Sequence, residues 1–325
     1  MTIPAAAETT NEAVLGLHHV TAISGDMVAN LAFYTGTLGL RLVKKSINQD
    51  DVQAYHLFYA DAVGSPGTDL TFFDWPQAGP TTPGPGTITR TTLRVSGVDA
   101  VDWWEHRLRD AGIGTQRDAT SGNILFADPE GQPLALADDS GLPGASVAWD
   151  ATVPANYALR GMLGVDIESA RPDATGLVLE RVLGFERTDT PSGYYEVRSE
   201  DGIAQIRVSA PSSGRLGRAG IGGVHHVAFR VRDDAHLLAF KERIEAAGLQ
   251  TSGYVDRYYF HSLYFREPGG VLFELATDGP GMAIDEDGAA LGNRVSIPPF
   301  LEARRAEIEA DLRPLPAPAY GDGAR

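Results

Sequence analysis

One pattern of local structure recurs four times along this sequence of 325 residues, and it constrains the fold more than any other feature. Each copy predicts a short strand, then a helix, then three further strands. A sheet of so few strands is too small to bury both of its faces, so each copy needs a partner. Two copies side by side would form one curved sheet with helices outside and a concave pocket inside. The opening strands are expected near 17–21, 91–95, 161–168 and 225–229.

The predicted helices are amphipathic and end at glycine. In the second copy, Val101, Trp104 and Leu108 recur at helical spacing, and Gly112 follows where such a helix stops. The fourth copy repeats this pattern and ends at Gly248. The four helices are expected at about 26–37, 99–111, 172–183 and 234–247.

Loop-like segments separate the copies. The run at 76–86 is rich in Pro and Gly and is predicted to be a linker, and 138–150 is the expected boundary between two halves. We therefore predict a disordered lead-in, two domains of two copies each, and an extension whose helix spans about 298–312. The bounds of these four parts are 1–14, 15–145, 146–280 and 281–325.

Composition and charge exclude several classes of function. The chain has no cysteine, so disulfides, thiolate metal sites and cysteine nucleophiles are excluded, and any metal must be held by imidazole and oxygen. The net charge of −16 would repel a phosphate backbone, which argues against a nucleic-acid partner. No apolar run approaches the roughly 18 residues that a membrane span needs. The start of the chain does not resemble a signal peptide, so we expect a cytoplasmic protein with no membrane partner.

Two histidines and one glutamate form the candidate metal site. His19 and His226 stand at the same place in the first and fourth copies, within GLHHV and GVHHV. Glu274 lies in the last strand of the fourth copy, within the apolar run VLFELA. A histidine in a strand is often only structural, but an unpaired carboxylate in an apolar strand would be costly. We predict that His19, His226 and Glu274 hold one divalent metal, mostly from the second domain.

The number of ligands decides the predicted chemistry. Counting along the copies places Phe72 of the first copy where Glu274 stands in the fourth, and Arg90 and Ala135 at the ligand positions of the second copy. Two imidazoles and one carboxylate leave adjacent coordination positions open, as in non-haem Fe(II) oxygenases. A fourth protein ligand would instead favour Lewis-acid isomerisation. We predict Fe(II) as the cofactor, with Mn(II) as the alternative.

Five motifs are spread over nearly the whole chain: LHHVTAISGD, AYHLFYAD with a following GSPGT, GVHHVAF, DRYYFHSLYFREPGGVLFELATD and DEDGAALG. With the fourfold repeat, they resemble the vicinal oxygen chelate superfamily, and within it the hydroquinone-type ring-cleaving dioxygenases. The resemblance implies an α+β fold of four βαβββ modules paired into two curved, barrel-like mixed sheets. It also implies a small aromatic diol and O₂ as substrates, Fe(II) as cofactor, and a possible homo-oligomer.

The resemblance assigns the metal to His19, His226 and Glu274, and pocket roles to His18, Thr21, His225, Arg257 and Tyr264. Strand alternation points Thr21 to the face of His19 but points His18 and His225 away from the metal. These two are therefore structural, or support the metal-binding imidazoles, or lie on a bulge.

The remaining pocket residues have several interpretations. Tyr264 could donate a hydrogen bond to a developing oxyanion, or act as an acid. Arg257 could bind a phenolate oxygen, or be a surface arginine paired with Asp256. For the whole chain, an extradiol catechol dioxygenase, a glyoxalase-type isomerase or lyase, and a non-enzymatic binding protein are the alternatives.

Overall fold

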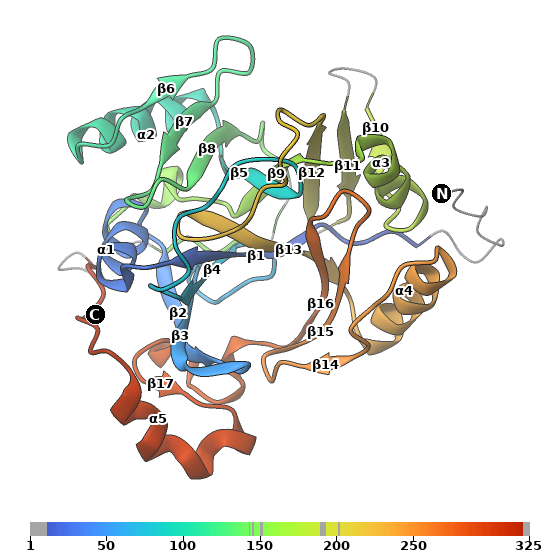
Figure 1. Cartoon of the computed structure of the whole chain (residues 1–325). Coiled ribbons are helices and arrows are strands. Elements are labelled where there is room, and N and C mark those ends of the chain that lie inside the picture. Colours follow the sequence, from blue (N-terminus) through green and yellow to red (C-terminus); the bar gives the residue numbers. More distant parts are fainter. Residues whose placement is uncertain are drawn as a thin grey trace.

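The computed structural model describes residues 12–142, 144, 146–149, 152–188, 193–200 and 202–320. Four βαβββ modules follow one another in this part of the chain, so the predicted fold class is confirmed (Figure 1). The first module comprises β1 (Leu17–Ser24), α1 (Met27–Ala32), β2 (Arg41–Asn48), β3 (Asp51–Ala60) and β4 (Asp69–Asp74). The second comprises β5 (Thr87–Val95), α2 (Val98–Asp110), β6 (Gln116–Arg117), β7 (Ile124–Ala127) and β8 (Pro133–Asp138).

The two later modules repeat the order. The third comprises β9 (Met162–Glu168), α3 (Pro172–Arg181), β10 (Glu186–Arg187), β11 (Tyr194–Arg198) and β12 (Ile203–Ser209). The fourth comprises β13 (Gly223–Val231), α4 (Asp234–Ala246), β14 (Val255–Asp256), β15 (Phe260–Arg266) and β16 (Leu272–Pro280). None of the helices in the described ranges is long and apolar enough to cross a membrane.

The modules do not pair in chain order. Strand β1 pairs antiparallel with β13, which joins the first module to the fourth, and β5 pairs antiparallel with β9, which joins the second to the third. The expected halves 15–145 and 146–280 therefore each contribute one module to each sheet. In each module one edge of the first strand is free to pair with the first strand of another module. Local sequence patterns do not reveal which module supplies that partner strand. Figure 1 shows β1 and β13 side by side at the centre.

Helices pack on the outer faces of the sheets, and their apolar sides are those predicted. Helix α2 buries Val101, Trp104 and Leu108. The N-cap residue of α1 is Asp26, whose carboxylate accepts hydrogen bonds from two backbone N–H groups of the first turn. Gly112 follows α2 with a φ of 77°, a left-handed conformation that ends the helix at little steric cost.

Residues 12–14, at the end of the predicted lead-in, are part of the folded structure. Residues 1–11 of the predicted lead-in lie outside the described residues, but Val14 is buried and its N–H donates to the Leu183 carbonyl at 3.0 Å. Glu12 pairs with Arg232 at 2.9 Å. The prediction of disorder was therefore wrong for residues 12–14, because Val14 contributes an apolar side chain to the core.

The C-terminal extension folds back against the first module. Strand β17 (Val295–Ser296) pairs parallel with β2, and a 3₁₀ segment (Pro299–Arg304) leads into α5 (Arg305–Asp311), close to the predicted helix. The ammonium group of Lys44 on β2 is fully buried, 2.7 Å from Asp285 and 2.5 Å from Glu286. The extension is thus held to the sheet by one buried cation and two carboxylates.

Replacing Lys44 by Ala should destabilise the protein by about 3–5 kcal/mol, because it leaves buried carboxylates without their counter-charge. Urea unfolding measures the change. Lys45→Ala, at the next and partly exposed position, is the matched control and should change the free energy of unfolding by less than about 0.5 kcal/mol. Equal effects of the two substitutions would contradict a stabilising role of the Lys44 cluster.

Candidate metal centre

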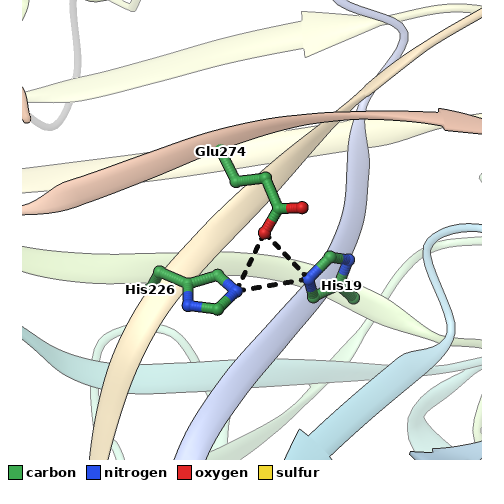
Figure 2. A group of neighbouring side chains, drawn as sticks. All are labelled: His19, His226 and Glu274. Atoms are coloured by element: carbon green, nitrogen blue, oxygen red, sulfur yellow. Dashed lines mark hydrogen bonds and ion pairs between the residues drawn. The ribbon is translucent and has the colours of Figure 1, made fainter. Parts of the chain in front are cut away.

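Three buried donor atoms converge on one point between β1, β13 and β16 (Figure 2). Nε2 of His19 lies 3.3 Å from Nε2 of His226, and Oε2 of Glu274 lies 3.2 Å from the first nitrogen and 2.9 Å from the second. The three side chains predicted as ligands are therefore brought together.

The spacing of these atoms fits a divalent cation. Bonds of about 2.1 Å at right angles place neighbouring ligand atoms about 3.0 Å apart, which is close to all three distances. Oε2 of Glu274 is fully buried and has no hydrogen-bond partner among the described residues. A buried carboxylate oxygen facing two imidazole nitrogens is costly unless a cation neutralises it. The residues present thus suit the 2-His-1-carboxylate arrangement.

Strand register places the three ligands on one concave face. His19 is opposite Ala228, and Thr21 is opposite His226, in the β1–β13 pair. Glu274 on β16 is opposite Ala228 in the parallel β13–β16 pair, so it lies beside both histidines. The metal centre therefore depends on contact between the first and fourth modules.

Ser262 orients the carboxylate. Its hydroxyl donates to Oε1 of Glu274 at 2.5 Å, which leaves Oε2 directed at the histidines. Burial alone would raise the pKa of Glu274, but positive charge on the adjacent imidazoles, of the kind that a bound cation would supply, holds it well below its usual range. Ser262 was not among the predicted site residues, although its place on the same strand face as Tyr264 was a usable signal.

His18 and His225 lie behind the imidazoles of His19 and His226. The β1–β13 register skips both residues, one on each strand, so each occupies an irregularity of the bulge type. Nδ1 of His18 is 3.0 Å from Nδ1 of His19, and Nδ1 of His225 is 2.8 Å from Nδ1 of His226. The bulge alternative therefore explains how both contact the ligands despite strand alternation.

One hydrogen-bond chain defines the protonation of His19. Nε2 of His18 is 3.1 Å from the Thr277 carbonyl, which can only accept, so this nitrogen carries the proton. Nδ1 of His18 is then an acceptor for the Nδ1–H of His19. The consequence is that Nε2 of His19 presents a lone pair to the metal position.

The residue equivalent to Glu274 is Thr71, and the prediction of Phe72 was wrong. Thr21 is opposite Thr71 in the β1–β4 pair, as Ala228 is opposite Glu274 in the fourth module. Phe72 faces the other side of the sheet, where its ring lies 4.5 Å from that of Tyr34. Counting from the preceding turn missed a one-residue offset, and such an offset reverses the face of a strand.

Thr71 does not add a fourth strong ligand. Its Oγ1 is 2.7 Å from Oγ1 of Thr21 and 2.9 Å from Nε2 of His56. Thr21 thus points to the predicted face, but it is hydrogen-bonded within the wall and does not line the cavity. Among the described residues, only the three predicted side chains form a cluster able to hold a metal.

A cavity with aromatic walls opens beside the metal position. Arg257 and Tyr264 both line it, as predicted, and the Arg257 Nε donates to the Tyr264 hydroxyl at 3.2 Å. Asp256, the alternative partner expected for Arg257, does not pair with it. The guanidinium instead donates two hydrogen bonds to the Asp50 carboxylate, at 3.2 and 2.9 Å. The cavity walls also include His56, Phe58, Phe73, Tyr259 and Phe260.

His56 is a further residue of the cavity wall that was not predicted. It stands on β3 opposite Phe73, the position that Ser262 holds in the fourth module. Burial, and then the neighbouring His19 and His226, hold the pKa of His56 well below its usual range. It is therefore a neutral imidazole in the wall of the cavity.

The chain as a whole is similar to known proteins. The sequence model of the Glyoxalase/Bleomycin resistance protein/Dioxygenase superfamily matches residues 16–136 and 178–275. The chain belongs to this superfamily. A crystal structure of a Bacillus subtilis protein described as a dioxygenase has a TM-score of 0.86 and 34% identity, covering 94% of this chain and 98% of the other. Glyoxalase I of Zea mays shares the fold at a TM-score of 0.57 and 14% identity, covering 81% of this chain and 92% of the other.

Relatives that match over nearly their whole length are named as dioxygenases. MhqA of Bacillus subtilis, named as a ring-cleaving dioxygenase, is 42% identical over 93% of this chain and 99% of its own length. The chlorohydroquinone/hydroquinone 1,2-dioxygenase of Sphingobium indicum is 30% identical over 91% of this chain and 95% of its own length. The expectations of this superfamily, and of a dioxygenase within it, are confirmed.

Replacing His18 by Ala should weaken binding of Fe(II) or Mn(II) by about 10- to 100-fold, because His19 loses the acceptor that orients it. Competition with a chromophoric chelator under anaerobic conditions measures the affinity. His106→Ala, on the exposed side of α2, is the control and should bind the metal as the wild type does. Unchanged affinity in the His18 variant would show that His18 does not support the site.

Acid should destabilise the metal-free protein through the two supporting histidines. Burial lowers the pKa of His18 and His225 from 6.5 to about 3, so between these values the unfolded chain binds protons that the folded chain does not. The stability that the neutral rings contribute is fully present above pH 6.5, and it is lost progressively as the pH falls below 6.5. Urea midpoints across this range should fall more steeply for wild type than for His225→Gln. Parallel curves would contradict this assignment.

Proposed function

We propose that this chain is a non-haem Fe(II)-dependent dioxygenase that opens the ring of a hydroquinone-type diol with O₂. The observation that carries the proposal is a three-donor site, without a fourth strong ligand among the described residues, beside an aromatic-walled cavity containing Arg257 and Tyr264. The relative named as a hydroquinone 1,2-dioxygenase supports the choice of a para-diol.

Fe(II) bound by His19, His226 and Glu274 would supply open coordination positions where an electron-rich ring and O₂ meet. Mn(II) suits the same donors and is the alternative. The Thr71 hydroxyl at the fourth position is already hydrogen-bonded and uncharged, which argues against the four-ligand Lewis-acid chemistry of an isomerase.

Arg257 and Tyr264 would bind and orient the oxygens of the substrate. Burial, and then the charge of Glu274, raise the pKa of Tyr264 above its usual range, so its hydroxyl remains a hydrogen-bond donor at neutral pH. Arg257 is fixed by Asp50 on one side and Tyr264 on the other, so its charge faces the cavity without reorganisation. Together they favour negative charge on a ring oxygen.

The aromatic walls would hold the ring flat and exclude water. Phe58, Phe73 and Phe260 line the same cavity as the two polar groups, and the Phe260 ring lies 5.1 Å from that of His19. A planar ring with oxygens at opposite ends fits a cavity that has a metal position and a guanidinium. The neutral His56 offers a further hydrogen-bond partner inside the wall.

Oxygen uptake tests the proposal. Anaerobic protein loaded with Fe(II) should consume O₂ when hydroquinone is added, and more slowly with catechol. Glu274→Gln should abolish uptake, and Tyr264→Phe should lower kcat by about 10²- to 10³-fold, the usual effect of removing a donor to a developing oxyanion. Tyr258→Phe, which removes a neighbouring hydroxyl outside the cavity, should leave kcat unchanged. Absence of uptake with a panel of para- and ortho-diols would overturn the assignment.

A further inference from the structure

The sheet formed by the second and third modules has a cavity at the place that corresponds to the metal centre. In the β5–β9 pair Thr92 is opposite Gly164 and Arg90 is opposite Asp166. This repeats the register of β1 and β13, where Thr21 is opposite His226 and His19 is opposite Ala228. Arg90 therefore stands at the position of His19, and Gly164 at the position of His226.

The other two ligand positions follow from the outer strands of this sheet. Asp166 is opposite Arg207 in the β9–β12 pair, so Arg207 corresponds to Glu274. Thr92 is opposite Ala135 in the β5–β8 pair, so Ala135 corresponds to Thr71. Arginine, glycine and alanine at these positions cannot ligate a cation, so this cavity needs a different kind of ligand.

The floor of the cavity carries two guanidinium groups and one carboxylate. Asp166 Oδ2 is 3.2 Å from Arg90 and 3.6 Å from Arg207, so both arginines approach the same oxygen. The Arg90 Nε is buried and has no hydrogen-bond partner among the described residues. Two guanidinium groups thus share one carboxylate oxygen, and Arg207, which is about half exposed, makes only the longer of the two contacts.

The cavity is large, and its walls suit an organic molecule. Its volume is about 650 Å³, and Leu125, Ala135, Leu163 and Val165 line it together with the Tyr194 ring. Two carboxylates besides that of Asp166 also line the cavity, and both accept backbone hydrogen bonds: Asp118 from Thr120 and Ser121, and Asp138 from Gly97 and Ser140. Arg90 and Arg207 are the two cationic groups of the lining, so an anion would have to bind by direct contact with their guanidinium groups.

We propose that this cavity is a second binding site, distinct from the metal centre, for a small organic carboxylate with a flat apolar body. The carboxylate binds the guanidinium groups of Arg90 and Arg207, and the apolar part lies against Leu163 and Tyr194. The site does not depend on the dioxygenase activity, because it shares no residue with the metal cavity.

Isothermal titration of the anaerobic, Fe(II)-loaded full chain with benzoate, and separately with muconate, tests the site. At least one of the two should bind saturably, and benzamide, the uncharged analogue of benzoate, should not. Arg207→Gln should weaken binding by about tenfold or more, the usual loss when a charged hydrogen bond is removed. Asp166→Asn should tighten it, because the competing carboxylate is removed. Arg187→Gln, an exposed arginine of the same module outside the cavity, should leave the affinity unchanged.

The Glu274→Gln variant distinguishes this site from the metal centre experimentally. That variant should lose ring cleavage and keep the affinity for the carboxylate. Four results would overturn the proposal: no saturable binding of either probe, equal binding of benzamide, an affinity unchanged in both the Arg207 and the Asp166 variants, or binding that disappears with Glu274→Gln. Because the two substitutions in the cavity have opposite expected signs, a general loss of folding cannot imitate the expected result.

Discussion

The antiparallel pairing of β1 with β13 is the contact on which the rest of the site depends. It brings His19 and His226, which are 207 positions apart in the chain, to within 3.3 Å. Irregularities at His18 and His225 place a second imidazole behind each ligand, and the parallel neighbour β16 delivers Glu274 between them. Without this pairing, the first module would have one histidine and the fourth a histidine and an unneutralised carboxylate, and neither could hold a metal alone.

The local pattern of the chain was sufficient to predict the modules, their helices and the three side chains that meet at the candidate metal centre, because each depends on periodicity or on the repeat. Long-range choices were not predictable in the same way. The pairing of the first module with the fourth depends on which open strand edges meet. That Thr71, and not Phe72, is the equivalent of Glu274 depends on a one-residue offset between two turns. Arg257 binds Asp50 rather than its sequence neighbour Asp256 because the turn between β2 and β3 reaches over the cavity, a contact that local sequence does not encode.

The two sheets have the same backbone arrangement but carry different charged side chains at equivalent positions. At equivalent positions the first sheet has His19, His226 and Glu274, which suit a cation, and the second has Arg90 and Arg207, which suit an anion. In both, the opening strands contribute the centre of the concave face and the outer strands contribute its sides. The chemistry of each cavity is therefore set by a few inward-facing side chains and not by the fold.

The central claim is that one divalent metal is bound by three protein atoms. Crystals grown anaerobically with Fe(II), and measured on both sides of the iron absorption edge, test it directly. We expect a single anomalous peak within bonding distance of Nε2 of His19, Nε2 of His226 and Oε2 of Glu274, with Thr71 still hydrogen-bonded to Thr21 and His56. A map without a peak at that point, or a peak to which a fourth side chain is bonded, would contradict it.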